Sequence, residues 1–520
     1  MEVIEGSYRK KLRWTIVFLL CICGAKAQVA EPSDSLVEVY KSGDTHFFRF
    51  CYPSKDAAGE DVVLSSMLIA WLPSKPATTD SIESLHIYSH YTITSDKESP
   101  SSDDNSTDRL LFSRLVKSRY GLIGLNSAYN FISRAVVIAP DYEGYGVSKE
   151  RSHPYLSQRL TAQQVMDAVE YGRILYQKHV NDQRALAFKS NWRTFSWGFS
   201  QGGAVALAVQ RHIEENDLSD ELHFRGSICG DGPYDLLATL RYYLNDDGTS
   251  YEASTEHQQG MCTMPMVIPM IIKGMLDTHP DMQEHALEDY ISQQFLDTGI
   301  MDWLASKELS TTDISKRWYE QLQYGLDAQG RHYSSSQMAE LFYSPSKDVV
   351  WARLDKLFTP GFYAYISNPD NFETVPTAKG DAWQDAHRAM AENSVAAGWQ
   401  PLHRIQFVHS RGDMVVPFGN YLAFRDAHPD DEDELYRIDD SIKSSDHATV
   451  GTTFFAYLCV SGSYGEYFQW LDASPTITGA KPIYQLPFDD DTWHDLSGRR
   501  LNGRPTKKGI YVFRGKKVAI

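Results

Sequence analysis

The sequence has few cysteines and few positive charges. Six of its 520 residues are cysteines, and no two have the CxxC spacing of a metal-binding knuckle. Acidic residues outnumber basic ones by 68 to 50, which gives a net charge of −18. A nucleic-acid partner is therefore not expected, because binding phosphate requires a basic face. The sequence also lacks HExxH and dinucleotide-binding fingerprints, so we predict no metal and no organic cofactor.

No run of apolar residues is long enough to cross a bilayer. The stretch WTIVFLLCICGA follows a basic segment and precedes AKA, the small residues that a signal peptidase recognises. We therefore expect residues 1–27 to be a cleaved secretory signal. Neither Cys21 nor Cys23 follows a small residue, so a lipid anchor is not expected. Secretion permits disulfides, and the pairing of the four later cysteines stays open: Cys51, Cys229, Cys262 and Cys459.

Short apolar stretches alternate with helical patterns in two parts of the chain. RAVVIAPDY, which begins at Arg134, is almost wholly apolar, as is typical of a strand covered on both faces. An amphipathic pattern from Thr161, the strand WRTFSW, an apolar helix and the strand FRGSIC follow in a β-α-β-α-β order. A similar pattern resumes with HRIQFVHS. This alternation predicts an α/β fold with a mostly parallel sheet and right-handed crossovers.

Between the two β/α parts the pattern is one of helices and loops. It includes the methionine-rich stretch MCTMPMVIPMIIKGML, which either packs between helices or lines an apolar pocket, since methionine fills irregular apolar space. A helical block inside a β/α sequence is typical of an insertion carried by the sheet. The predicted division is a signal (1–27), a first core part (28–235), a helical insertion (236–400), a second core part (401–475), and a linker with a tail (476–520).

One glycine-rich stretch, SWGFSQGGAVALAV, places Ser200 between Gly198 and Gly202. A G-x-S-x-G match alone is weak evidence, but this match follows an apolar strand and opens a helix, as a nucleophilic serine requires. Side chains at the flanking positions would collide with the neighbouring strand and helix, so glycines are needed there. The backbone N–H of Gln201 would then point at a developing oxyanion. The alternative is an inert serine in a glycine-rich turn.

A nucleophilic serine needs a base, and the base needs a carboxylate that orients it. His447 lies in the polar loop of RIDDSIKSSDHATV, before a helical pattern, and Asp413 lies in a Gly-Asp turn after the strand RIQFV. The gap between them is enough for one β/α unit. Two rivals fit less well. His428 lies in an acidic run that we expect to be solvated, and Asp446 adjoins the histidine and would need an awkward local contact.

Together these motifs resemble the α/β-hydrolase superfamily over about residues 40–475, apart from the insertion. GFSQG matches the nucleophile elbow, GDMVVP the acid turn, and DHATV the histidine loop. The resemblance implies a mostly parallel central sheet with helices on both faces and an inserted helical lid. It also implies a second oxyanion donor in the loop IYSHYTITS, from the N–H of Tyr91 or Thr92. His90 is present there, but Tyr91 stands where glycine is usual.

Within the superfamily the arrangement looks most like secretory lipases and secreted esterases. This implies hydrolysis of a small-molecule or lipid ester through Ser200, His447 and Asp413, by way of an acyl-enzyme. A serine exopeptidase of the prolyl-oligopeptidase type is an alternative, because the elbow does not discriminate. Too few residues precede the first β/α unit, however, for the β-propeller of those enzymes. A non-catalytic protein that binds a hydrophobic ligand under its lid is a second alternative.

The C-terminal segment has the opposite charge to the rest of the chain, with basic residues clustered after Asp495. DLSGRRL and KGIYVFRGKKVAI resemble the C-terminal sorting domain of proteins exported by the type IX secretion system. The resemblance implies the type IX machinery as a partner and a place at the cell surface or outside the cell. The alternative is a terminal β-hairpin docked on the hydrolase, with the periplasm as the location.

Overall fold

The computed structural model describes residues 30–105, 134–245, 257–325 and 335–473, apart from positions 347–348, 373, 430 and 461–462, and short stretches between 493 and 519. The predicted signal (1–27) and most of the predicted linker lie outside the described residues. The chain divides into two compact units, Met1–Ser474 and Pro475–Ile520.

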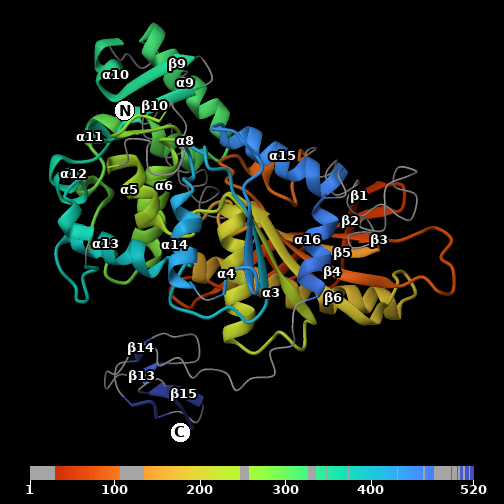
Figure 1. Ribbon diagram of the computed structural model, residues 1–520. Helices are drawn as coiled ribbons and strands as arrows, with labels where there is room; N and C mark the ends of the chain where they lie inside the picture. The colour runs from red at the N-terminus through yellow and green to blue at the C-terminus, as the bar shows by residue number, and fades with distance from the viewer. Residues whose placement is uncertain are drawn as a thin grey trace, which may run out of the picture. The chain divides into compact units, whose positions relative to one another are not determined.

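A nine-stranded sheet forms the centre of the first unit (Figure 1). The first three strands and their neighbour β5 pair antiparallel, and every later pairing in the sheet is parallel. The predicted α/β class with a mostly parallel sheet is confirmed. In spatial order the strands are β1 (Val37–Ser42), β2 (Thr45–Lys55), β3 (Asp61–Trp71), β5 (Ala135–Pro140), β4 (Ile82–Ser89), β6 (Phe188–Phe199), β7 (Phe224–Gly230), β11 (Arg404–Val408) and β12 (Tyr436–Asp439).

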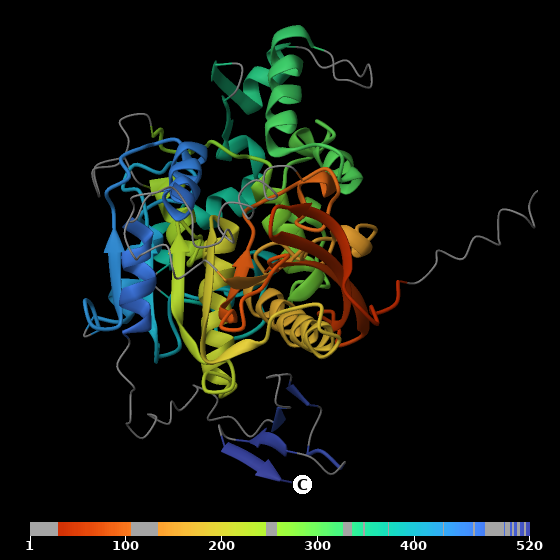
Figure 2. The same cartoon turned by 90° about the vertical axis from the view of Figure 1, so that its right-hand side faces the viewer.

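Helices cover both faces of this sheet, as predicted. One face packs against α3 (Gln158–Asn181) and α4 (Gln201–Glu215), and α14 (Gly419–Ala427) joins the same core. The other face packs against α15 (His447–Val460) and α16 (Ser463–Asp472), which are the blue helices beside the sheet in Figures 1 and 2.

Strand β6 shows why the two faces differ. Phe195 and Trp197 are buried in the core that includes α15 and α16. Ser196, which lies between them, points to the other face, where its Oγ donates a hydrogen bond to the Ala206 carbonyl of α4 at 3.3 Å. This alternation follows from the two-residue period of a strand. The small residues on the second face allow α4 to approach the sheet, so the chain can turn sharply from β6 into α4 at Ser200.

The predicted insertion packs around an apolar core that includes its Met270 and Met275 and also Tyr155 and Leu156 from the first core part. It also contains a small antiparallel sheet that the sequence did not suggest, in the order β8 (Met261–Cys262), β10 (Val349–Arg353) and β9 (Phe342–Ser346). Figure 1 shows the insertion in green to cyan beside the central sheet. Its helices are α5 (Leu236–Asn245), α6 (Val267–Thr278), α7 (Gln293–Leu296), α8 (Ile300–Ser306), α9 (Thr311–Tyr324), α10 (Ser335–Leu341), α11 (Leu354–Leu357), α12 (Pro360–Ile366) and α13 (Ala382–Glu392).

The second unit contains a four-stranded antiparallel sheet. Its strands are two to four residues long. In spatial order they are β14 (Arg500–Leu501), β13 (Trp493–His494), β15 (Ile510–Phe513) and β16 (Lys516–Ala519).

Among the described residues, no helix is long and apolar enough to cross a membrane. The cysteines with described side chains, Cys51, Cys229 and Cys262, are free thiols. Burial raises the pKa of Cys262 to about 12, so this thiol stays protonated and unreactive. The side chain of Cys459 lies outside the described part of the chain.

Candidate active site

Ser200 occupies a sharp turn between β6 and α4. Its backbone has φ 59° and ψ −127°, a conformation that residues other than glycine rarely adopt. The turn is held because the Ser200 N–H donates a hydrogen bond to the Gly230 carbonyl at 2.8 Å, and the Ser200 carbonyl accepts one from Gly203 at 2.9 Å. The turn therefore places the Ser200 hydroxyl beyond the carboxyl ends of the strands.

The glycines around Ser200 are required by close backbone contacts. A Cβ on Gly198 would lie 2.3 Å from the Gly202 carbonyl oxygen, and a Cβ on Gly202 would lie 2.0 Å from the Ser89 oxygen. A Cβ on Gly203 would lie 2.3 Å from the Gly230 oxygen. Since backbone atoms cannot move aside as a flexible side chain does, all three positions accept only glycine. The sequence pattern identified the first two for this steric reason and said nothing specific about Gly203.

The three residues predicted to act together do lie together. The His447 Nε2 is 2.8 Å from the Ser200 Oγ, and the His447 Nδ1 is 2.5 Å from the Asp413 Oδ2. Ser200 opens α4, Asp413 lies in the turn after β11, and His447 is the first residue of α15. The strands before these segments run parallel, so the segments meet at the carboxyl ends of the strands, although the serine and the histidine are 247 residues apart.

Asp413 is oriented through both of its carboxylate oxygens. While Oδ2 faces His447, Oδ1 accepts hydrogen bonds from the backbone N–H groups of Val415 at 2.8 Å and Val416 at 3.0 Å. Burial alone would raise the pKa of Asp413, but the charge and hydrogen bond of His447 outweigh it and hold this pKa below its usual value. An ionised Asp413 accepts a hydrogen bond from the N–H at Nδ1, so the lone pair of Nε2 is directed at the serine hydroxyl.

Comparison with known structures gives the fold of this site's scaffold. The chain resembles the rice cell wall degrading esterase LipA of Xanthomonas oryzae, with a TM-score of 0.54 and 19% identity over 80% of this chain and 89% of that one. It also resembles a protein of Legionella pneumophila described as a hydrolase, with a TM-score of 0.51 and 14% identity over 85% of this chain and 91% of that one. The chain has the α/β-hydrolase fold. No protein-family model and no curated protein sequence matches it.

In this α/β-hydrolase fold, the loop after β4 lies directly against the elbow. The carbonyl oxygens of Ser89 and His90 are the atoms that a Cβ on Gly202 would meet first, at 2.0 and 2.7 Å. Tyr91 and Thr92 follow in the same loop, and the Thr92 hydroxyl lies 2.7 Å from the hydroxyl of Tyr155. The predicted oxyanion donors therefore belong to a segment that touches the elbow, and the choice between Tyr91 and Thr92 stays a prediction.

His90 has a structural environment rather than a reactive one. Its ring stacks on Tyr142 with a centroid distance of 3.9 Å, and its Nε2 lies 3.1 Å from the Asp141 carbonyl oxygen. Burial lowers the pKa of His90 to about 4, so the ring is neutral near pH 7. The ring thus anchors the loop after β4 to the loop after β5.

Sequence reasoning missed a histidine that orients Gln201. The His153 Nδ1 lies 2.7 Å from the Glu143 carbonyl oxygen, so it carries the proton, and its Nε2 accepts a hydrogen bond from the Gln201 side-chain amide at 3.0 Å. Burial and the nearby charge of Lys307 lower the pKa of His153 to about 3, which keeps the ring neutral. The contact fixes the residue whose backbone N–H follows the serine. No local motif marks His153, which is distant from Gln201 in sequence.

The two rival residues have other partners. His428 is buried, not solvated as we expected, because its ring stacks on Phe424 with a centroid distance of 4.3 Å. Its Nε2 lies 2.9 Å from the Trp399 carbonyl oxygen, which ties two loops together. Asp446 is exposed, and its carboxylate accepts a hydrogen bond from the N–H of Thr449 at 3.1 Å, within the first turn of α15. Both side chains therefore support local backbone rather than His447.

Asp141 is a buried carboxyl next to the loop that carries Tyr91. Its oxygens accept hydrogen bonds from the Ser101 N–H at 2.7 Å and from the hydroxyls of Ser65 and Ser101 at 2.5 Å. Burial raises the pKa of Asp141 from 3.8 to about 6, although these hydrogen bonds lower it.

We expect Asp141→Asn to change how stability depends on pH. Because the folded protein binds the Asp141 proton more tightly than the unfolded chain does, the stability from this group is complete below pH 4. It is lost as the pH rises to about 6, and two pKa units correspond to about 3 kcal/mol. Asparagine cannot ionise, so the variant should gain stability relative to wild type over that range. Urea unfolding of both proteins from pH 4 to pH 8 measures this, and a difference that does not vary with pH would contradict it.

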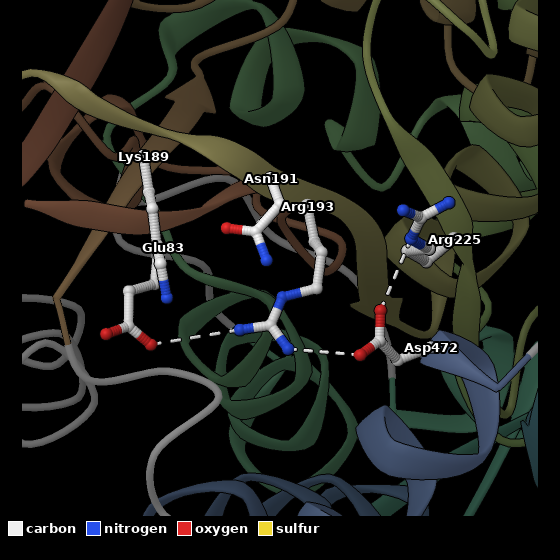
Figure 3. Close-up of a pocket in the computed structure, with 6 residues that line it drawn as sticks. All are labelled: Glu83, Lys189, Asn191, Arg193, Arg225 and Asp472. Atoms are coloured by element: carbon white, nitrogen blue, oxygen red, sulfur yellow. Dashed lines mark hydrogen bonds and ion pairs between the residues drawn. The ribbon is translucent and has the colours of Figure 1, made fainter.

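A polar cavity of about 250 Å³ lies near the amino ends of the central strands (Figure 3). Arg193 reaches the carboxylates of Asp472 at 3.0 Å and Glu83 at 3.8 Å, and Arg225 reaches Asp472 at 3.3 Å. Glu83 and Arg225 lie at the starts of β4 and β7, whereas Ser200 follows the end of β6. The cavity is therefore separate from the site around Ser200, and its ion pairs attach the end of α16 to the sheet.

No group of three or more potential metal ligands comes together in the part of the chain that the structure describes. Among the described residues, the site brings together a serine, a histidine, a carboxylate and the backbone N–H groups around them. Such a set can carry a nucleophilic attack on a carbonyl carbon and the proton transfers that accompany it.

Proposed function

We propose that the protein is a serine hydrolase that cleaves carboxylic esters through Ser200, His447 and Asp413. The observation that carries this proposal is the unbroken line of contacts from Asp413 through His447 to Ser200, at 2.5 and 2.8 Å. A hydroxyl nucleophile needs such an oriented base. The name of the Xanthomonas oryzae neighbour, a cell wall degrading esterase, supports esters as the substrate class by analogy of fold.

In the proposed reaction the Ser200 Oγ attacks the ester carbonyl carbon while the His447 Nε2 takes its proton. The oxyanion that forms is stabilised by the N–H of Gln201 and by that of Tyr91 or Thr92. His447 then gives the proton to the leaving alcohol, and an acyl-enzyme results. Water, deprotonated by His447, hydrolyses the acyl-enzyme to release the acid. Asp413 orients the imidazole and stabilises its charged form throughout.

We propose that residues 236–400 act as a lid. Ser200 and His447 are each only 8% exposed, so a substrate must displace covering segments to reach them. Tyr243 in α5 donates hydrogen bonds to the carbonyls of Met414 at 2.9 Å and Val415 at 2.6 Å, which joins the start of the insertion to the turn of Asp413. This attachment places the base of the proposed lid beside the acid of the proposed triad.

One observation favours the esterase over the exopeptidase. The first described strands, β1 to β3, belong to the central sheet and do not build a separate propeller. A non-catalytic binding protein would lack turnover altogether, so one assay separates all three functions.

That assay uses p-nitrophenyl esters with acyl chains of two to sixteen carbons, beside a panel of aminoacyl p-nitroanilides, with wild-type protein and Ser200→Ala. We expect ester turnover that the variant lacks, and the preferred chain length would distinguish a lipase from a short-chain esterase. Turnover of anilides alone would assign the protein to the peptidases. No turnover of either panel by folded protein would contradict the hydrolase proposal.

We also propose that the protein is exported, through the signal at residues 1–27 and with residues 476–520 directing it to the type IX machinery. The expected mature chain begins at Gln28. Mass spectrometry of the protein isolated from the culture medium and from the cell surface tests this. An intact N-terminus in the cytoplasm would contradict export, and periplasmic accumulation would contradict a role for the tail.

A further inference from the structure

A second carboxyl contacts Asp413 within the site. Asp231 directly follows β7, and β7 pairs with β11, whose following turn carries Asp413. Asp231 is fully buried with φ 33°, and its N–H donates a hydrogen bond to the Val408 carbonyl at 2.9 Å. The carboxyl of Asp231 lies against that of Asp413, and its Oδ2 has no other hydrogen-bond partner among the described residues. Two ionised carboxylates repel each other in such a contact, whereas one proton between them makes a hydrogen bond.

The hydrogen-bond donors around the pair decide which carboxyl keeps that proton. Asp413 accepts hydrogen bonds from three N–H groups, those of Val415, Val416 and His447. Asp231 accepts one from the Ser410 N–H at 3.0 Å through Oδ1, and its Oδ2 meets no donor among the described residues. Since N–H donors favour the charged form of a carboxyl, Asp413 is the ionised partner and Asp231 the neutral one.

His409 does not neutralise a charge on Asp231. Its Nε2 lies 3.4 Å from the Asp231 Oδ1, but the N–H at Nε2 donates its hydrogen bond to the Val416 carbonyl at 2.8 Å. Burial lowers the pKa of His409 to about 4, so the ring is neutral near pH 7. Burial and the charge of Asp413 raise the pKa of Asp231 well above its usual value. An ionised Asp231 would be a second buried anion beside Asp413, and no cation pairs with it among the residues that the structure describes.

We propose that Asp231 is a positioning residue, a neutral carboxylic acid that donates a hydrogen bond to Asp413 and so holds the carboxylate that orients His447. The expected effect on kcat rests on the proposed function, whereas the protonation state of Asp231 does not. The other titratable groups that face the pair are His409, His447 and the phenols of Tyr234 and Tyr243. Burial raises the pKa values of both phenols, so they remain neutral. The two carboxyls therefore behave as one unit with a single negative charge.

Two substitutions of Asp231 distinguish positioning from simple packing. In Asp231→Asn an amide N–H replaces the O–H donor, so kcat should stay within about threefold of wild type, with the acid limb of the pH profile unmoved. In Asp231→Ala the donor is lost, and kcat should fall by about 10- to 100-fold with little change in KM. If Asp231 were ionised, Asp231→Asn would remove a charge and shift the acid limb to lower pH, which would overturn the proposal.

Asp167 provides the matched control. It lies on α3, accepts a hydrogen bond from the Ser54 hydroxyl at 2.6 Å, and has a pKa raised by burial. Helix α3 packs against β2, near one side of the sheet, whereas Asp413 follows β11, near the other side. Asp167→Asn and Asp167→Ala should leave kcat and the pH profile unchanged. Equal losses of kcat in the Asp231 and Asp167 variants would mean a general effect on folding, and would overturn the positioning role.

An infrared measurement tests the protonation state without any turnover. At pH 8 the difference spectrum between wild type and Asp231→Asn should contain the C=O stretch of a protonated carboxyl, whereas that for Asp167→Asn should contain carboxylate bands. Carboxylate bands alone for Asp231→Asn would overturn the proposal, even if Asp231→Ala fails to fold. Failure of the ester assay with the infrared band present would contradict the proposed function and leave the shared proton established.

Discussion

Replacing Ser200 with alanine is expected to lower kcat for ester hydrolysis by about a millionfold, the scale seen when a hydrolase loses its nucleophile. The variant keeps His447 and the oxyanion donors but has no atom that can form the acyl-enzyme. Its stability should change little, because the Ser200 side chain does not cap α4 and alanine occupies the same turn. Single-turnover measurements with the best p-nitrophenyl ester, together with urea unfolding, give both quantities.

Ser196 is the matched control for this change. It lies four residues earlier on β6, is fully buried, and its hydroxyl donates a hydrogen bond to the Ala206 carbonyl. Ser196→Ala should keep kcat near wild type while costing about 1 kcal/mol of stability. An organophosphonate that labels wild type and Ser196→Ala, but not Ser200→Ala, would identify the reactive serine directly. Equal activity in the two alanine variants would exclude Ser200 as the nucleophile.

The local part of this site could be predicted from sequence because its constraints are steric and lie within a few residues. The elbow needs glycine at 198 and 202, where a Cβ would meet backbone oxygens at 2.0–2.4 Å, and such a need leaves a recognisable pattern. Asp413 and His447 were found because each follows a strand in a turn or polar loop, in the order expected of the fold. Parallel strands end at one edge, so these loops meet there.

The parts that could not be predicted depend on which segments become neighbours. Asp231 also follows a strand, but only the pairing of β7 with β11 reveals that its carboxyl meets that of Asp413. His428 lies in an acidic run that suggests solvation, yet Phe424 and the Trp399 carbonyl bury it. The loop predicted to complete the oxyanion hole would act through backbone N–H groups, which leave no side-chain signature. For this reason the motif limits the choice to Tyr91 or Thr92 and does not decide it.

Asp413→Asn is expected to lower kcat by about ten-thousandfold while the protein stays folded. Two N–H donors, those of Val415 and Val416, face the Oδ1 position, so the asparagine oxygen must occupy it. The amide NH₂ then faces the His447 Nδ1, which becomes an acceptor, and the imidazole proton moves to Nε2. A protonated Nε2 cannot take the proton of Ser200, so the base is lost although its position is kept.

Nitrogen NMR of His447 and the kinetics of Asp413→Asn test this argument together. In wild type the proton should be on Nδ1, and in the variant on Nε2, at a pH where the ring is neutral. Asp446→Asn is the control, because this exposed neighbour accepts a hydrogen bond from Thr449 within α15 and should affect neither the tautomer nor kcat by more than about twofold. A loss below about tenfold in Asp413→Asn, or an unchanged tautomer, would mean that Asp413 does not orient the base. A reversed tautomer would also show that the orientation of His447 depends on the negative charge of Asp413. A neutral Asp231 that donates a hydrogen bond to Asp413 leaves that charge in place.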